Sequence, residues 1–216
     1  MKTGSLPSEL RERVHICVKD GICDARGDPV PSAWLGTISE LLFDWARSVF
    51  AAPAVFRLQR AGREPATRPG IDAFEILGDN KDEKSLTFIV WEVKGIDGDP
   101  RVKASDIYHD LEVEVPRRLA TLVAFLTRQF GADENSPLAR FVSRLIDMYL
   151  NDSEEKNIGG CVVHDSAASS ESQDVFCNFQ SRFPGLKPDH LYGVLIHLPH
   201  FGATRSRVWD ALWNVP

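Results

Sequence analysis

The sequence predicts a single α/β domain in which helices flank a central mixed sheet. Segment 31–52 repeats apolar residues every three or four positions, as an amphipathic helix does. Segments 71–77 and 86–94 are short runs of strand-forming residues separated by a polar turn, which indicates an antiparallel hairpin. A length of 216 residues suits one domain with a sizeable core. We therefore expect one domain over residues 1–216, with its core at about 31–165.

The expected elements follow in the order strand, helix, three strands, two helices, two strands and helix. Ser32, Ser105 and Ser136 are candidate helix caps, and Pro116 predicts a break or kink in the helix that contains it. Residues 165–174 are expected to form a surface loop. The expected ranges are 13–18, 31–52, 54–60, 71–77, 86–94, 105–130, 136–150, 158–165, 191–199 and a final helix from 204.

Composition excludes several classes of protein. The net charge of −6 argues against a protein that coats nucleic acid non-specifically. No apolar run approaches the roughly 20 residues that span a bilayer, and the N-terminus lacks the apolar segment of a signal peptide. We therefore expect a cytoplasmic protein whose four cysteines are free thiols. A zinc site from Cys161, His164 and Cys177 is an alternative, although their spacing matches no standard finger or ribbon.

The stretch FIVWEVKG, residues 88–95, places two charges inside a run that otherwise favours burial. A hairpin turn centred near Asp82 puts Leu77 beside Thr87 and Asp72 beside Glu92. Residues two apart on a strand share a face, so Asp72, Glu92 and Lys94 are expected to lie together. Two converging carboxylates repel each other unless a cation lies between them. The register thus predicts a Mg²⁺ or Mn²⁺ site, with Lys94 placed to hold or help deprotonate a bound water, or to neutralise an oxyanion.

These residues resemble the motif of the PD-(D/E)xK nuclease superfamily, with GID at 70–72 and WEVK at 91–94. The resemblance implies a restriction endonuclease-like core over about 31–165: a helix, three antiparallel strands, a helix and a further strand. It also implies that Asp72, Glu92 and the carbonyl of Val93 bind the metal, that Lys94 serves the attacking water, and that Glu40 on the first helix completes the site.

The sequence departs from that motif in two places. Ile71 stands where the family usually has proline. One exonuclease branch of the family has a glutamine four residues before a tyrosine, and this chain has no glutamine four residues before Tyr108.

In its combination of small size, Glu-x-Lys and a later apolar strand, the chain also resembles nuclease subunits of bacterial anti-phage systems, such as the Hachiman type. That resemblance implies DNA as the substrate and a helicase-like ATPase as a partner. No phosphate-binding G-x-x-x-x-G-K-[ST] is present in the sequence, so any ATP-driven step would belong to the partner.

Basic residues near the predicted hairpin are candidates for contacts with phosphates. They are Arg57, Arg60, Arg63, Arg68 and Lys103. The alternative for these residues is a solvent-exposed loop whose positive charges offset those of nearby acidic side chains.

For the candidate metal site, the alternative is a structural ion pair of Glu92 and Lys94 on an edge strand. The runner-up function is a catalytically inactive protein that uses the same fold as an interaction module, for which Trp209 and Trp213 would suit a docking surface.

Overall fold

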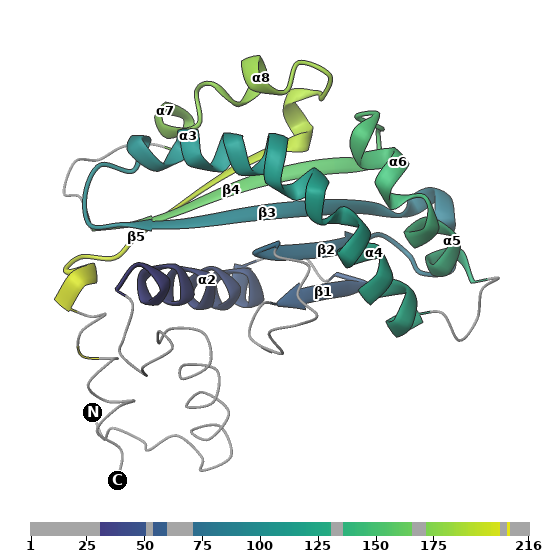
Figure 1. The fold of residues 1–216 in the computed structure, drawn as a ribbon, viewed down its shortest axis with the longest axis horizontal. Coiled ribbons are helices and arrows are strands. Elements are labelled where there is room, and N and C mark those ends of the chain that lie inside the picture. The colour runs from purple at the N-terminus through teal and green to yellow at the C-terminus, as the bar shows by residue number, and fades with distance from the viewer. Residues whose placement is uncertain are drawn as a thin grey trace, which may run out of the picture.

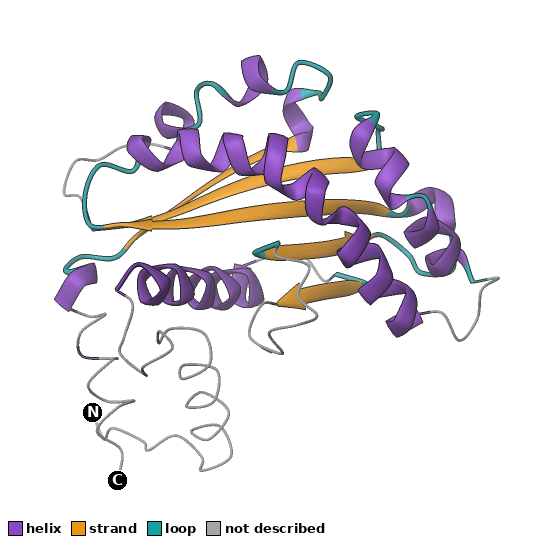
Figure 2. Cartoon of the chain, viewed as in Figure 1, coloured by secondary structure: helices purple, strands orange, loops and turns teal. Residues whose placement is uncertain are grey.

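Five strands form one mixed sheet in the computed structural model of the protein, which describes residues 31–50, 54–59, 71–130, 136–165, 172–203 and 207 (Figures 1 and 2). The strand order is β1-β2-β3-β4-β5, with β1, β2 and β3 antiparallel and β3, β4 and β5 parallel. The expectation of an α/β protein with a mixed sheet is confirmed. The strands are β1 Phe56–Gln59, β2 Ala73–Leu77, β3 Thr87–Ile96, β4 Lys156–His164 and β5 Leu191–His197.

Helices cover both faces of this sheet (Figure 2). The helix α2, Pro31–Phe50, packs on one face, where Ile38 and Phe43 join Trp91 in a buried cluster. The opposite face carries one long helical segment: α3 Arg101–His109, the π-helical turn η2 Asp110–Glu114 and α4 Val115–Phe130 (Figure 1). Short elements complete the structure: the 3₁₀ turns η1 Glu83–Ser85 and η3 Pro188–His190, and the helices α5 Pro137–Ser143, α6 Leu145–Leu150, α7 Ser172–Val175 and α8 Phe179–Arg182.

The predicted hairpin register is confirmed. Leu77 pairs with Thr87 and Ala73 with Trp91, as a symmetric turn near Asp82 requires. Alternation along the strands then separates two sets of side chains. Phe74, Ile76, Phe88 and Val90 pack under α3 and α4, whereas Ala73, Ile89, Trp91 and Val93 pack under α2.

Several expectations about the helices need correction. The helix α2 already includes Pro31, so Ser32, expected as its cap, lies within the helix. The helix expected from Ser105 begins at Arg101, directly after Pro100, so Ser105 is not its cap. The segment expected as one helix over 136–150 divides at Arg144, although Ser136 does cap its start by accepting from the N–H of Ala139 at 3.1 Å. Residues 172–174, expected at the end of a surface loop over 165–174, belong to α7, Ser172–Val175. The expected strand 13–18 lies outside the described residues, as does nearly all of the helix expected from 204.

Pro116 widens the long helix instead of breaking it. In the turn η2 the N–H of Val115 donates to the carbonyl of Asp110, five residues earlier, and not to that of Leu111. In this five-residue pattern, residue 116 would donate its N–H to the carbonyl of Leu111, but Pro116 has no N–H. The hydroxyl of Tyr149 fills that place by donating to the Leu111 carbonyl at 2.6 Å. The buried carbonyl is thus satisfied and the chain stays helical through the proline.

Candidate metal site

The start of β2 brings Asp72 opposite Glu92, as the register predicts. The ladder between β2 and β3 ends at the pair Ala73–Trp91, and Asp72 stands one residue beyond it. Asp72 Oδ2 accepts a hydrogen bond from the N–H of Val93 at 2.8 Å. A strand residue turns its N–H and its C=O toward the same neighbouring strand. The Val93 carbonyl, predicted to be a metal ligand, therefore faces the edge where Asp72 lies.

Glu92 is buried with one of its two oxygens unsatisfied. Its side chain is 1% exposed. Oε2 lies 3.4 Å from Lys94 Nζ, whereas Oε1 makes no hydrogen bond with any described residue. Burial raises the pKa of Glu92 to about 9; the charge of Asp72 adds to this rise and Lys94 opposes it. At neutral pH and without a cation, Glu92 therefore holds a proton, which it can share in a hydrogen bond with Asp72.

Lys94 lies between two acids. Its Nζ is 2.5 Å from Asp110 Oδ2 and 3.4 Å from Glu92 Oε2. Burial alone would lower the pKa of Lys94, but the carboxylates of Asp72 and Glu92, with Asp110, outweigh burial and raise it. Lys94 is thus an ammonium held in place, which suits it to stabilise negative charge. Helping to deprotonate a bound water, the other task expected of Lys94, stays a prediction.

Sequence reasoning missed Asp110, which contributes a further carboxylate to this cluster. It lies at the first position of η2, on the helical segment that covers the Asp72–Glu92 face. The side chains of Lys94 and Asp110 are 25% and 22% exposed, so the cluster reaches solvent on their side. Pro116 was the available signal, because a proline inside a helical pattern indicates a local change of helix geometry. The sequence did not indicate which residue that change would turn toward Lys94.

The oxygen donors of this cluster fit a hard divalent cation. Mg²⁺ and Mn²⁺ prefer carboxylate and carbonyl oxygens, and Mg²⁺ usually takes one or two carboxylates and keeps several waters. A cation between Asp72 and Glu92 would replace the shared proton and give Glu92 Oε1 a partner. In the described part of the chain, no three His, Cys, Asp or Glu side chains are arranged to hold an ion. The protein would therefore supply two carboxylates and the Val93 carbonyl, and water or phosphate oxygens would complete the coordination.

Two alternatives from the sequence lose support. The ion pair of Glu92 and Lys94 is present at 3.4 Å, but it does not lie on the edge strand expected for it, because β3 is the third of five strands and pairs on both sides. The zinc alternative needs Cys161, which is fully buried in the cluster under α2, where burial raises the pKa of its thiol well above the usual range. No group of three His, Cys, Asp or Glu side chains in the described residues is arranged to hold a zinc ion.

The remaining predicted residues are placed as follows. Glu40 is half-buried on α2, which covers the opposite face of the sheet, so its role as a third ligand stays a prediction. Arg57 Nε lies 2.7 Å from Glu75 Oε1, and exposed Lys103 pairs with Asp106 at 2.7 Å. Their predicted phosphate contacts compete with these ion pairs. Arg60, Arg63 and Arg68 lie outside the described residues.

Comparison with known proteins adds no assignment. The sequence matches no family model and no curated protein. Within the described residues, no helix is long and apolar enough to cross a membrane. A functional conclusion therefore depends on the geometry of the site and on the motif resemblance described above.

Proposed function

We propose that the protein is a metal-dependent nuclease that hydrolyses phosphodiester bonds of DNA, with Mg²⁺ or Mn²⁺ as the cofactor. One observation carries the proposal. Two carboxylates, Asp72 and Glu92, converge in a buried place where one carboxylate oxygen has no partner among the described residues, and an ammonium group lies next to them. Such a place is costly for a structural ion pair and favourable for a bound cation.

Each residue of the chain has a distinct task in this proposal. Asp72, Glu92 and the Val93 carbonyl would hold the ion, which when bound polarises a phosphoryl oxygen and acidifies a water ligand. Lys94 would donate hydrogen bonds to the attacking water and to the negative charge that develops on phosphate oxygens. Asp110 would act as a positioning residue. Once an ion neutralises Asp72 and Glu92, Asp110 is the carboxylate contact of Lys94 that keeps its full charge.

The order of elements also supports the proposal. From α2 to β4 the chain runs helix, three antiparallel strands, helical segment and a strand parallel to the third. This order agrees with the arrangement that the resemblance to PD-(D/E)xK nucleases implies. The role in defence against phage or foreign DNA, and the helicase-like ATPase partner, rest on the resemblance alone and are part of the proposal.

Cleavage of DNA by the purified full-length chain tests the proposal. Linear and plasmid DNA should be cut with Mg²⁺ or Mn²⁺ and remain intact with EDTA. Asp72→Asn and Lys94→Ala should each lower the cleavage rate by at least about 10²-fold, because each removes a charge that acts on the reacting phosphate. Lys187→Ala is the matched control: this exposed lysine is paired with Glu154 away from the site, so cleavage should change by less than about threefold. Cleavage that persists in EDTA, or in both site variants, would refute the proposal.

An exposed apolar surface on α2 favours the second candidate, an interaction module without catalysis. Leu41, Trp45, Val49 and Phe50 are between 43% and 79% exposed. Leu41, Trp45 and Val49 are one turn apart along the helix, so they form a stripe on the side away from the sheet. The two candidates differ in metal binding. A protein that binds no Mn²⁺ in calorimetry, cuts no DNA and loses a partner upon Trp45→Ala would be the interaction module.

A further inference from the structure

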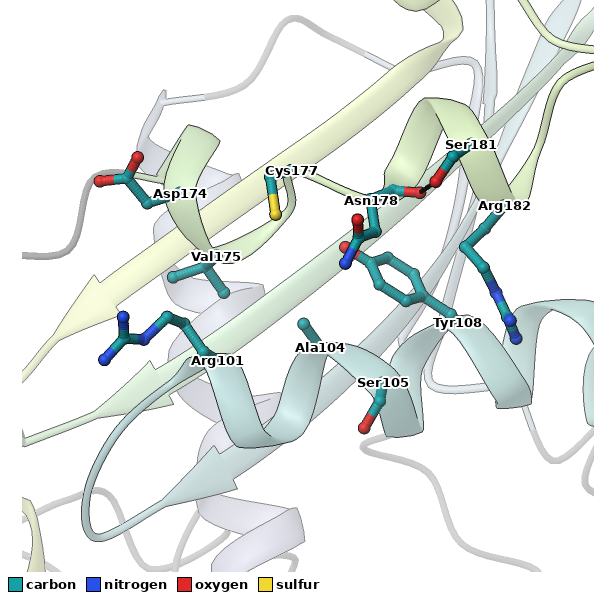
Figure 3. Close-up of a pocket in the computed structure, with 10 residues that line it drawn as sticks. All are labelled: Arg101, Ala104, Ser105, Tyr108, Asp174, Val175, Cys177, Asn178, Ser181 and Arg182. Carbon is teal, nitrogen blue, oxygen red and sulfur yellow. Dashed lines mark hydrogen bonds between the residues drawn. The ribbon is translucent and has the colours of Figure 1, made fainter.

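A cavity lies between α3 and the segment that contains α7 and α8 (Figure 3). Its volume is about 570 Å³, within the usual range for small-molecule sites. None of the residues of the candidate metal site lines it. The lining comes from Arg101, Ala104, Ser105 and Tyr108 of α3, and from Asp174, Val175, Cys177, Asn178, Ser181 and Arg182 across from it.

The charged lining favours an anion. Figure 3 shows Arg101 and Arg182 toward opposite ends of the cavity, on different elements. Asp174 is the one acidic residue among the lining residues, in a chain whose net charge is −6. Both arginines now make exposed ion pairs, Arg101 with Asp99 at 2.6 Å and Arg182 with Glu112 at 2.7 Å. Exposed pairs of this kind contribute little to stability, so a phosphate, which binds a guanidinium through two parallel hydrogen bonds, can replace them.

A buried hydroxyl at the cavity has no well-formed hydrogen bond, which independently indicates a ligand. Tyr108 is 4% exposed, and its Oη has only the nearby Asn178 backbone N–H beside it, which does not meet the usual distance and angle limits of a hydrogen bond. Burial raises the pKa of Tyr108 to about 12, and the nearby Asn178 backbone opposes this rise only in part. The phenol is thus neutral and keeps its proton. A buried donor without an acceptor is unfavourable, and a polar ligand in the cavity would correct it.

We propose that this cavity binds a small phosphorylated molecule of mononucleotide size, with its phosphate on one of the two arginines, an anionic or acceptor group toward the other, and an acceptor atom on the Tyr108 hydroxyl. Ser105, Asn178 and Ser181 supply further polar contacts around it. The same chemistry is offered by a free nucleotide and by the 5′-phosphate end of a nucleic acid strand. The inference does not depend on the metal site, because the two sites share no residue.

Calorimetric titration of the full-length protein, in EDTA to exclude the metal site, tests the inference. The probes are adenosine monophosphate, inorganic phosphate, adenosine, and a thymidine dinucleotide with and without a 5′-phosphate. We expect the phosphorylated probes to bind and adenosine and the unphosphorylated dinucleotide not to bind. Tighter binding of adenosine monophosphate than of the phosphorylated dinucleotide would identify a free nucleotide, and the reverse would identify a strand end.

Three variants locate the binding. Arg101→Ala and Arg182→Ala should each weaken binding of adenosine monophosphate by about 10-fold or more, because each removes charge-assisted hydrogen bonds. Tyr108→Phe, which keeps the ring in its packing against Phe179, should weaken it by about fivefold. Arg144→Ala is the control, since Arg144 is an exposed arginine paired with Glu83 away from the cavity. Absence of binding by every phosphorylated probe at 10 mM (roughly the limit of a weak site), or binding that all three cavity variants leave unchanged, would overturn the inference.

Discussion

Glu75 and Glu92 are both 1% exposed on neighbouring strands, yet their surroundings differ completely. Glu75 lies under α2, where Arg47 binds both of its oxygens and Arg57 donates to Oε1 at 2.7 Å. Arg47 in turn lies 5.0 Å from the centre of the Trp91 ring. Glu92 lies on the opposite face with one ammonium at 3.4 Å and an unsatisfied Oε1.

The difference separates a structural carboxylate from a candidate functional one. Two guanidiniums satisfy the oxygens of Glu75 and balance its charge, so this cluster needs nothing from outside the protein. The cluster around Glu92 has three carboxyl groups and one ammonium, and burial raises the pKa of Glu92 to about 9. Burial of a charged residue is therefore not by itself a sign of function. A functional role is indicated where the surrounding protein leaves the charge of a buried carboxylate uncompensated and one of its oxygens without a hydrogen bond.

The largest expected effects come from replacing each glutamate by glutamine. Glu92→Gln imitates the protonated form and should change the free energy of unfolding at pH 7 by less than about 1 kcal/mol. It should lower DNA cleavage by about 10³-fold. Glu75→Gln should leave arginine charge uncompensated and lower the free energy of unfolding by about 3 kcal/mol. Urea denaturation and cleavage assays of both variants measure these effects. Equal loss of stability in the two variants would contradict the contrast.

The metal should stabilise the protein in a pH-dependent way. The folded chain holds the Glu92 proton up to about pH 9, whereas an unperturbed carboxyl releases it near 4.5. The metal-free protein therefore loses stability as pH rises between these values. A divalent ion replaces this proton, so its affinity should rise by about tenfold per pH unit toward pH 9. At about 100 times its dissociation constant, Mn²⁺ should add about 2.7 kcal/mol to the free energy of unfolding.

Thermal denaturation with and without Mn²⁺, at pH 6, 7 and 8, measures this effect. Glu92→Gln should lose the stabilisation at every pH. Glu154→Gln, which alters an exposed acid paired with Lys187, should keep it. Stabilisation by Mn²⁺ that is independent of pH would place the ion elsewhere.

The Asp110–Lys94 contact predicts a smaller effect that is limited to the reaction rate. Asp110→Asn should lower kcat by about tenfold, since it removes a charge that holds Lys94, while Mn²⁺ affinity stays within about twofold. Asp110→Glu should restore part of the rate. Asp106→Asn, one turn earlier and paired with Lys103, is the control. If Mn²⁺ binds and Asp110→Asn cuts DNA at the wild-type rate, the positioning role fails while the nuclease proposal stands.

We expect the smallest effect for Asp44, which lies on α2, on the side of the sheet where Glu75 is paired with two arginines. Burial raises the pKa of Asp44 to about 6; Arg57 opposes the rise and Glu75 adds to it. The folded state therefore holds the Asp44 proton at a pH where the unfolded chain has lost it, and stability falls as pH rises from about 4 to 6. Asp44→Asn should raise the free energy of unfolding at pH 7 by about 1 kcal/mol, because partial exposure screens the shift. No gain should appear at pH 3.5. Urea denaturation at both pH values provides the measurement.

The sequence predicted what depends on strand alternation and missed what depends on side-chain direction. Leu77 and Thr87 pair as expected because a short symmetric hairpin leaves little freedom of register. Asp72 and Glu92 follow from the same register. Arg57 was assigned to phosphate because composition shows the sign of a charge and not its partner. Its partner, Glu75, lies on the neighbouring strand, paired across from it.

Asp110 lay beyond sequence reasoning for a different reason. Helical periodicity assigns directions by counting 3.6 residues per turn, and that count fails where η2 widens the helix. The outcome depends on Tyr149, 38 residues later, whose hydroxyl satisfies the carbonyl that Pro116 leaves open. A long-range contact thus decides a local geometry, which a single sequence does not reveal.

The widened turn also lets one helical segment serve two purposes. A π turn amounts to one residue more than a regular helix needs, and it rotates the preceding part by about 100° relative to the following part. The buried side of α4, which includes Leu119, Leu122 and Leu126, can therefore stay matched to the core while Asp110, at the start of the widened turn, contacts Lys94. Insertion or loss of a single residue here would re-aim every side chain of α3 at once. Core packing and site geometry can in this way change separately within one continuous helix.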